Sequence, residues 1–109
     1  MQKYNKKIKK EIRRLAEIAH KRELENALVD LKQKFSDWDN KELDTFKLDH
    51  EIYLYHVQTS RAIFKKYNND NQLDMAVSSA AARGIIEKEE IDEEVYEILK
   101  PIINRFGGY

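Results

Sequence analysis

The stretch KKIKKEIRRLAEIAHKRELENALVDLKQKF (Lys6–Phe35) decides the fold, because its apolar residues keep a helical period throughout but change direction in the middle. The first apolar stripe is Ile8, Ile12, Leu15 and Ala19, and the second is Leu24, Ala27 or Leu28, Leu31 and Phe35. The five-residue step from Ala19 to Leu24 turns the second stripe by roughly 120° from the first, at about 100° per residue. We therefore expect a long first helix that bends or projects, so that its two halves meet different neighbours.

Three more helices are expected after the first. The turn and capping residues of SDWDNKELD (36–44) and NNDN (68–71) separate amphipathic stretches, and Gly84 is placed to cap a helix in the left-handed conformation. The expected bounds of the four helices are about 3–35, 44–67, 72–83 and 91–106, and residues 107–109 are expected to form a flexible tail. The sequence predicts one all-α domain over residues 1–109, a small four-helix bundle with a long first helix.

Length and composition limit the classes of protein. The chain has 109 residues, of which 41% are hydrophobic and 37% charged, so it can build one hydrophobic core. It contains no cysteine, which excludes disulfides, thiolate zinc sites and cysteine nucleophiles and is compatible with the reducing cytosol. No apolar run approaches the roughly 20 residues that a membrane-spanning helix needs. We expect a cytoplasmic protein without a transmembrane segment.

The formal net charge is zero, but the charges are unevenly distributed. Residues 1–14 carry seven Lys or Arg against the single Glu11, and residues 87–97 carry seven Asp or Glu against the single Lys88. These ends are solvated helix termini, or they meet within a chain or between two chains, or the basic end binds a polyanion.

The first apolar stripe and its basic borders form the predicted interaction surface. Its residues are Ile8, Ile12, Leu15 and Ala19 with Lys6, Lys7, Lys10 and Arg13. Because this stripe points away from the direction that the rest of the helix buries, we expect it to bind a protein partner, most simply in a homodimer. In the dimer it would meet its own copy or the acidic start of the last helix, which carries Glu89, Glu90, Glu93 and Glu94.

A line of polar residues, here called the polar seam, runs along the second helix. It consists of Asp49, Tyr53, His56, Ser60 and Tyr67, which on a straight helical wheel fall in the middle of an apolar arc. A buried polar group without a partner costs roughly 1–3 kcal/mol, so an inward seam requires partners, with His20 as one candidate. The seam is then a core network, a subunit interface or a ligand pocket.

Motifs that carry chemistry are incomplete in this chain. Glu17-Ile-Ala-His20 is a single Glu-x-x-His, whereas a di-iron bundle needs two such motifs and a Glu from each of two other helices. Ser60, His56 and Asp49 are spread along one helix and cannot meet at one reacting atom as a catalytic triad does. We therefore predict no catalytic residue, no metal site and no cofactor.

The function predicted from the sequence is that of a non-catalytic protein-binding or regulatory protein that self-associates through the N-terminal half of its first helix. The alternative is a nucleic-acid-binding regulator that uses the same basic segment to contact phosphates. A second alternative is a helical bundle that binds a small ligand or a metal ion.

Overall fold

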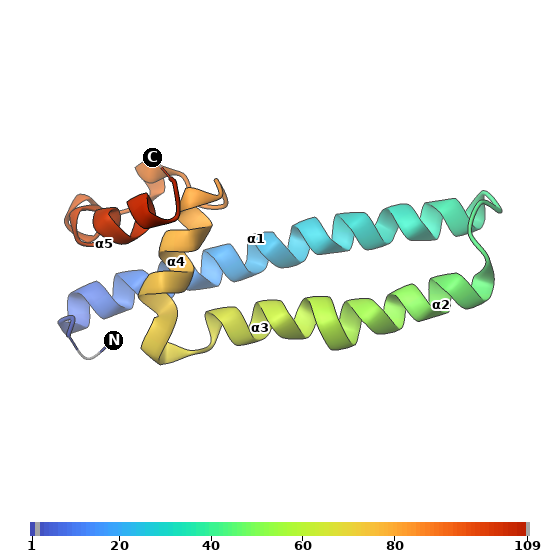
Figure 1. The fold of residues 1–109 in the computed structure, drawn as a ribbon, viewed down its shortest axis with the longest axis horizontal. Coiled ribbons are helices and arrows are strands. Elements are labelled where there is room, and N and C mark those ends of the chain that lie inside the picture. The colour runs from blue at the N-terminus through green and yellow to red at the C-terminus, as the bar shows by residue number, and fades with distance from the viewer. Residues whose placement is uncertain (2, 109) are drawn as a thin grey trace.

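The computed structural model describes Met1 and residues 3–108, and its elements are all helical, as expected from the sequence. In chain order the helices are α1 (Lys6–Asp39), α2 (Thr45–Leu54), a π-helical segment (Tyr55–Ser60), α3 (Arg61–Tyr67), α4 (Leu73–Ala82) and α5 (Glu93–Arg105), with short 3-10 turns at Asp70–Gln72 and Lys88–Glu90. The molecule is elongated, with extents of 52 × 24 × 20 Å. Figure 1 shows α1 running along its whole length, with α2 and α3 returning beside it.

Helix α1 is one unbroken helix that ends at Asp39, beyond the expected end near Phe35. The Asn5 side chain begins it by accepting a hydrogen bond from the Ile8 N–H at 2.9 Å. Its last turn is held by the returning chain, because the Trp38 indole N–H donates to Thr45 Oγ1 at 3.0 Å. The turn residues around position 36 lie inside the helix, which ends where Lys41 takes a left-handed φ of +61° and the Glu42 N–H donates to the Asp37 carbonyl at 2.8 Å.

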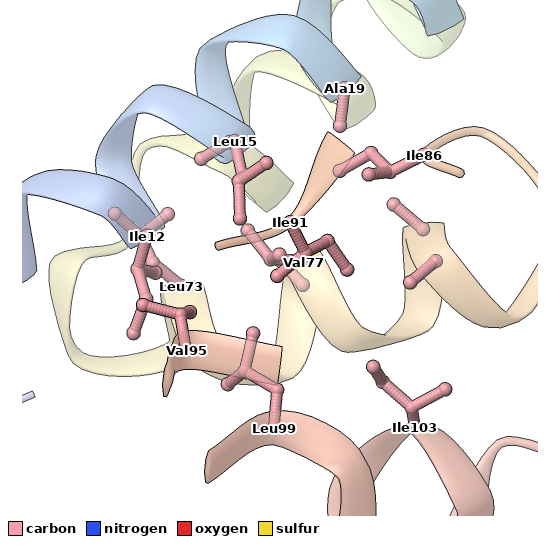
Figure 2. Close-up of a cluster of buried hydrophobic side chains, with 14 of the residues drawn as sticks. Ile12, Leu15, Ala19, Leu73, Val77, Ile86, Ile91, Val95, Leu99 and Ile103 are labelled. Carbon is pink, nitrogen blue, oxygen red and sulfur yellow. The ribbon is translucent and has the colours of Figure 1, made fainter. Parts of the chain in front are cut away.

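The first apolar stripe of α1 forms the centre of the hydrophobic core. Ile8, Ile12, Leu15 and Ala19 are each at most 2% exposed. Figure 2 shows three of them against side chains of the C-terminal segments, which include Val77 of α4 and Leu99 of α5. The prediction that this stripe is an association surface is therefore wrong. The stripe is covered because α4 and α5 fold back over the first half of α1, so Ile8, Ile12, Leu15 and Ala19 are buried within one chain.

Helix α4 can approach its neighbours closely because its buried positions are small. Ala76, Val77 and Ala80 are buried, and Gly84 ends the helix with a φ of +79°, the left-handed conformation predicted for it. The Ile85 N–H then donates to the Ala80 carbonyl at 2.9 Å, and the following residue enters the core.

Gly107 and Gly108 form backbone hydrogen bonds at the end of α5. Gly107 has a φ of +80°, and the Gly108 N–H donates to the Ile103 carbonyl at 3.2 Å, so the two glycines close α5. A Cβ atom at Gly108 would lie 2.4 Å from Ala82 Cα, which shows that the backbone packs directly on α4. The flexibility expected of residues 107–109 stays a prediction, and Tyr109 lies outside the described residues.

The π-helical segment changes which residues of the returning chain face α1. Helices α2 and α3 form one continuous rod through this segment, which adds one residue to the helical repeat and turns the later residues of the rod back by about 100°. In a straight helix Leu48 and Tyr67 would point roughly 100° apart. With the added residue they share one direction, and each is only 5% exposed.

Deleting Gln58, an exposed residue of the π segment, should therefore be tolerated. Removing the extra residue would turn the π segment into regular α-helix and leave α2 and α3 in the same rotation relative to each other. The melting temperature followed by circular dichroism should therefore change little. Deleting Val29, an exposed residue of regular α1, should lower the melting temperature much more. Every later residue of α1 then turns by about 100° relative to the rod. A larger loss for the Gln58 deletion than for the Val29 deletion would contradict this account.

Candidate functional site: a projecting two-helix arm

The second half of α1 and the α2–α3 rod project from the core as an antiparallel pair, here called the arm (residues 20–39 and 45–67), as Figure 1 shows. Among the described residues, ten large apolar side chains are exposed, and eight of them lie on the arm. The eight are Leu28, Val29, Phe35, Trp38, Phe46, Ile52, Tyr53 and Phe64, and the other two are Met75 and Phe106. The arm is thus the part of the molecule with the most uncovered apolar surface.

The two helices of the arm meet along one row on each helix, here called the contact line. On α1 it consists of His20, Leu24, Ala27, Leu31, Lys34 and Trp38, and on the rod of Leu48, Glu51, Tyr55, Thr59, Ile63 and Tyr67. Lys34 forms an ion pair with Glu51 across it, and Ala27 and Thr59 line one shallow groove of about 150 Å³. The contact line has the 4-3-4-3-4 spacing of a packed helical seam on α1.

Residues one position after the contact line lie about 100° further round each helix. In an antiparallel pair this rotation leads to the same side of the arm on both helices. The second helix runs in the opposite direction and its contact line also points in the opposite direction, so the two reversals cancel. That side is here called the arm face: Lys21, Glu25, Leu28, Lys32, Phe35 and Asp39 of α1, with Asp49, Ile52, His56, Ser60 and Phe64 of the rod. Its apolar members are exposed by 37% to 57%.

The opposite side of the arm is covered at its base by α4 and α5. Ala19, one position before the line, is fully buried, and Arg22, two positions before Leu24, donates to the Ile85 carbonyl at 2.9 Å. Arg22 also binds both carboxylate oxygens of Glu90, at 2.7 and 2.6 Å, and these hydrogen bonds lower the pKa of Glu90 to about 2. The core helices therefore leave the arm face open.

The structure places the polar seam differently from the straight-wheel prediction. Asp49, Tyr53 and His56 are exposed, Ser60 is half-buried, and only Tyr67 is buried. The prediction that the whole seam points inward is wrong, because the π segment breaks the constant rotation that a straight wheel assumes. Asp49, His56 and Ser60 lie on the arm face instead, while Tyr53 points away from α1.

A polar cluster that sequence reasoning missed joins the arm to the core. Glu23 accepts hydrogen bonds from the Tyr67 hydroxyl, from Arg83 Nη1 at 3.1 Å and from Lys66 Nζ at 3.2 Å. Burial raises the pKa of Glu23, but the three donors together outweigh it and hold the pKa below its ordinary value. Burial and the adjacent Glu23 carboxylate raise the pKa of Tyr67. No local motif signals this cluster, since its members come from three separate helices or helix ends.

Within the described residues, His20, the predicted partner of the polar seam, contacts the seam only at Tyr67. Its ring stacks on Tyr67 with a centroid distance of 5.9 Å and meets Phe64 edge-on at 6.2 Å. It therefore packs at the junction of α1 and α3 rather than binding the polar residues further along the rod.

The basic N-terminal segment meets the acidic start of α5 within the same chain. Lys6, Lys7, Lys10 and Arg13 are exposed, and Lys7 Nζ lies 3.3 Å from Glu94 Oε2. The Arg14 guanidinium donates to the Glu90 carbonyl oxygen at 3.0 Å. Part of the basic N-terminal segment thus pairs with the acidic start of α5 within one molecule.

Neither a metal centre nor a membrane span is found in the part of the chain that the structure describes. Across Met1 and residues 3–108, no group of three or more His, Asp or Glu side chains could hold a metal ion. No helix over the same residues is long and apolar enough to cross a bilayer.

Comparison with protein-family models, with curated proteins and with solved structures gave no match. The geometry of the arm is therefore the basis for a functional proposal.

Replacing Glu23 by Gln should destabilise the protein by roughly 1.5–3 kcal/mol at neutral pH, the usual loss for hydrogen bonds to a charged group. The pKa of Glu23 is lower in the folded protein than its ordinary value of 4.5, so its contribution is complete above that pH. The contribution is lost as the pH falls through the folded pKa. Urea unfolding measures the free energy of unfolding of wild type and of Glu23→Gln. The difference between the two values should be smaller at about pH 3 than at about pH 7.

The exposed Glu42→Gln, outside the arm face, is the matched control and should change stability little at either pH. An equally large difference between wild type and Glu23→Gln at both pH values would contradict a role for the Glu23 charge.

Proposed function

We propose that this protein is a non-catalytic binding protein that docks a partner protein on the arm face. The observation that carries the proposal is the row of four large apolar side chains along one side of a helical pair only one layer thick. Leu28 is 47% exposed, Phe35 42%, Ile52 37% and Phe64 57%. Contiguous exposed apolar surface of this kind is typical of protein interaction sites.

The shape and the rim of the arm face favour a protein over a small molecule. Small-molecule sites are usually hollows of roughly 300–1,000 Å³. The groove beside the contact line measures only about 150 Å³, and it is lined on the side opposite the arm face, by Asp30 and Leu54. Exposed charged residues of both signs border the apolar row, among them Glu25, Lys32 and Asp49. A flat apolar centre with a polar rim is the usual anatomy of a protein interface.

A second candidate function is the binding of nucleic acid by the start of α1. The observation in its favour is that the buried apolar stripe turns the basic side chains outward. Lys6, Lys10 and Arg13 form no ion pair with any described residue, so they are free to contact phosphates. The neutral chain and the acidic start of α5 nearby weaken such an attraction.

A photo-crosslinking amino acid at position 28 should form covalent adducts with a partner protein in cells that produce this chain, because the Leu28 side chain lies on the arm face. The same amino acid at position 29 is the matched control, since Val29 is more exposed, at 65%, but points away from the arm face. Adducts are measured by mass shift on a denaturing gel. Equal adducts at both positions, or none at position 28, would contradict the proposal.

Gel retardation with DNA and RNA at two salt concentrations tests the second candidate. If this segment binds phosphates, each contact should add about 0.9 to the slope of log affinity against log salt for duplex DNA. Replacing Lys6, Lys10 and Arg13 with Gln would then reduce that slope. Under the arm-face proposal we expect no retardation even at low salt.

A further inference from the structure

We infer that the partner of the arm face is a second copy of this chain, and that two arms pack face to face and antiparallel as a four-helix bundle. The inference rests on the proposed function, because it names the occupant of the same surface. The evidence comes from the charges, the apolar register and the size of the arm face.

The charges on the α1 edge of the arm face are complementary to themselves when one copy is reversed. Lys21, Glu25, Lys32 and Asp39 are all exposed and alternate in sign along the helix. Antiparallel pairing places Lys32 against Glu25 of the second copy, and brings Lys21 within reach of Asp39 of the second copy. Parallel pairing in register would place like charges together, which is unfavourable. The edge therefore selects a second, reversed copy.

Leu28, Ile52 and Phe64 fit the same twofold axis, which places Phe35 opposite Lys21 of the second copy. Lys34 pairs with Glu51 and Glu23 with Lys66, so the rod residue level with Leu28 lies between these pairs, close to Gln58. Gln58 is midway in sequence between the two apolar rod residues of the arm face, Ile52 and Phe64, and also between His56 and Ser60. An axis through this level sets Leu28 against Leu28 of the second copy.

On the rod, the same axis sets Ile52 against Phe64 of the second copy and His56 against Ser60 of the second copy. This match depends on the π segment. In a straight helix Ile52 and Phe64 would point roughly 120° apart, and the added residue reduces this to about 20°. Both apolar residues of the rod can therefore face the second copy together.

The arm is large enough for a stable dimer. Its roughly 20-residue length gives about 30 Å, and two helices side by side are about 20 Å wide. Each copy would bury roughly 600 Å², and both together about 1,200 Å², the lower end of the range for stable protein interfaces. Helices α4 and α5 pack on the other side of α1, as Ala19 and Arg22 show, so they leave room for the second arm.

Charge exchange between Glu25 and Lys32 tests the pairing, with sedimentation equilibrium of the purified protein as the measurement. Wild type should be a dimer. Glu25→Lys alone and Lys32→Glu alone should each weaken the dimer by roughly ten-fold or more, because each places like charges together twice. An equal mixture of the two variants should form a heterodimer, and the double variant Glu25→Lys/Lys32→Glu should recover wild-type affinity. Weakening without recovery would overturn the pairing.

Asp30→Lys is the matched control, because this exposed residue precedes the contact line and lies on the opposite side of the arm. It should leave the dimer unchanged. Circular dichroism of every variant should be that of wild type, since all three positions are exposed.

The direction of pairing can be read by disulfide formation, because the chain has no native cysteine. Leu28→Cys lies at the axis and should form an intermolecular disulfide on oxidation, whereas Asn40→Cys at the tip of the arm should not. Crosslinking at position 40, with or without crosslinking at position 28, would overturn the antiparallel arrangement. A wild-type monomer at several hundred micromolar would overturn the inference altogether. The proposed function would still stand if position 28 crosslinks to a different protein in cells.

Discussion

The structure depends on a constraint in α1: a single straight helix carries two apolar stripes that point roughly 120° apart. Each stripe needs its own neighbour, because no one layer can cover both. Helices α4 and α5 cover the first stripe, and the α2–α3 rod partly covers the second at Leu24, Ala27 and Leu31 but leaves Phe35 exposed. The elongated shape follows, because the two neighbours lie at different levels along α1, and so does an arm with one uncovered side.

The arm also depends on the π-helical segment of the rod. A rod of this length would drift away from α1 if it kept a constant rotation, and Tyr67 would leave the junction with His20 and Glu23. One added residue returns it to the contact line. The same correction aligns Ile52 with Phe64, so the feature that closes the arm internally also produces a continuous apolar row on its outer side.

Polar contacts fix how the arm leaves the core. Arg22 and Glu23 are neighbours in sequence, yet Arg22 reaches Glu90 before α5 and Glu23 reaches Tyr67 and Arg83 at the ends of α3 and α4. Charge-assisted hydrogen bonds of this kind are directional, so they set the orientation of three segments around one turn of α1. This junction gives a rigid base to the arm face, which favours binding with little loss of conformational entropy.

The sequence by itself determined the all-helical class, the long first helix, the two offset stripes and the glycine that ends α4, because period, capping and φ preference act over a few residues. It could not show that Ile8, Ile12, Leu15 and Ala19 are covered by their own chain, since a buried stripe and a docking stripe have the same pattern. It also could not place Asp49 and His56, because a π turn is invisible to a wheel of constant pitch. Only the tertiary structure decided these points, since both depend on which helices are near each other in space.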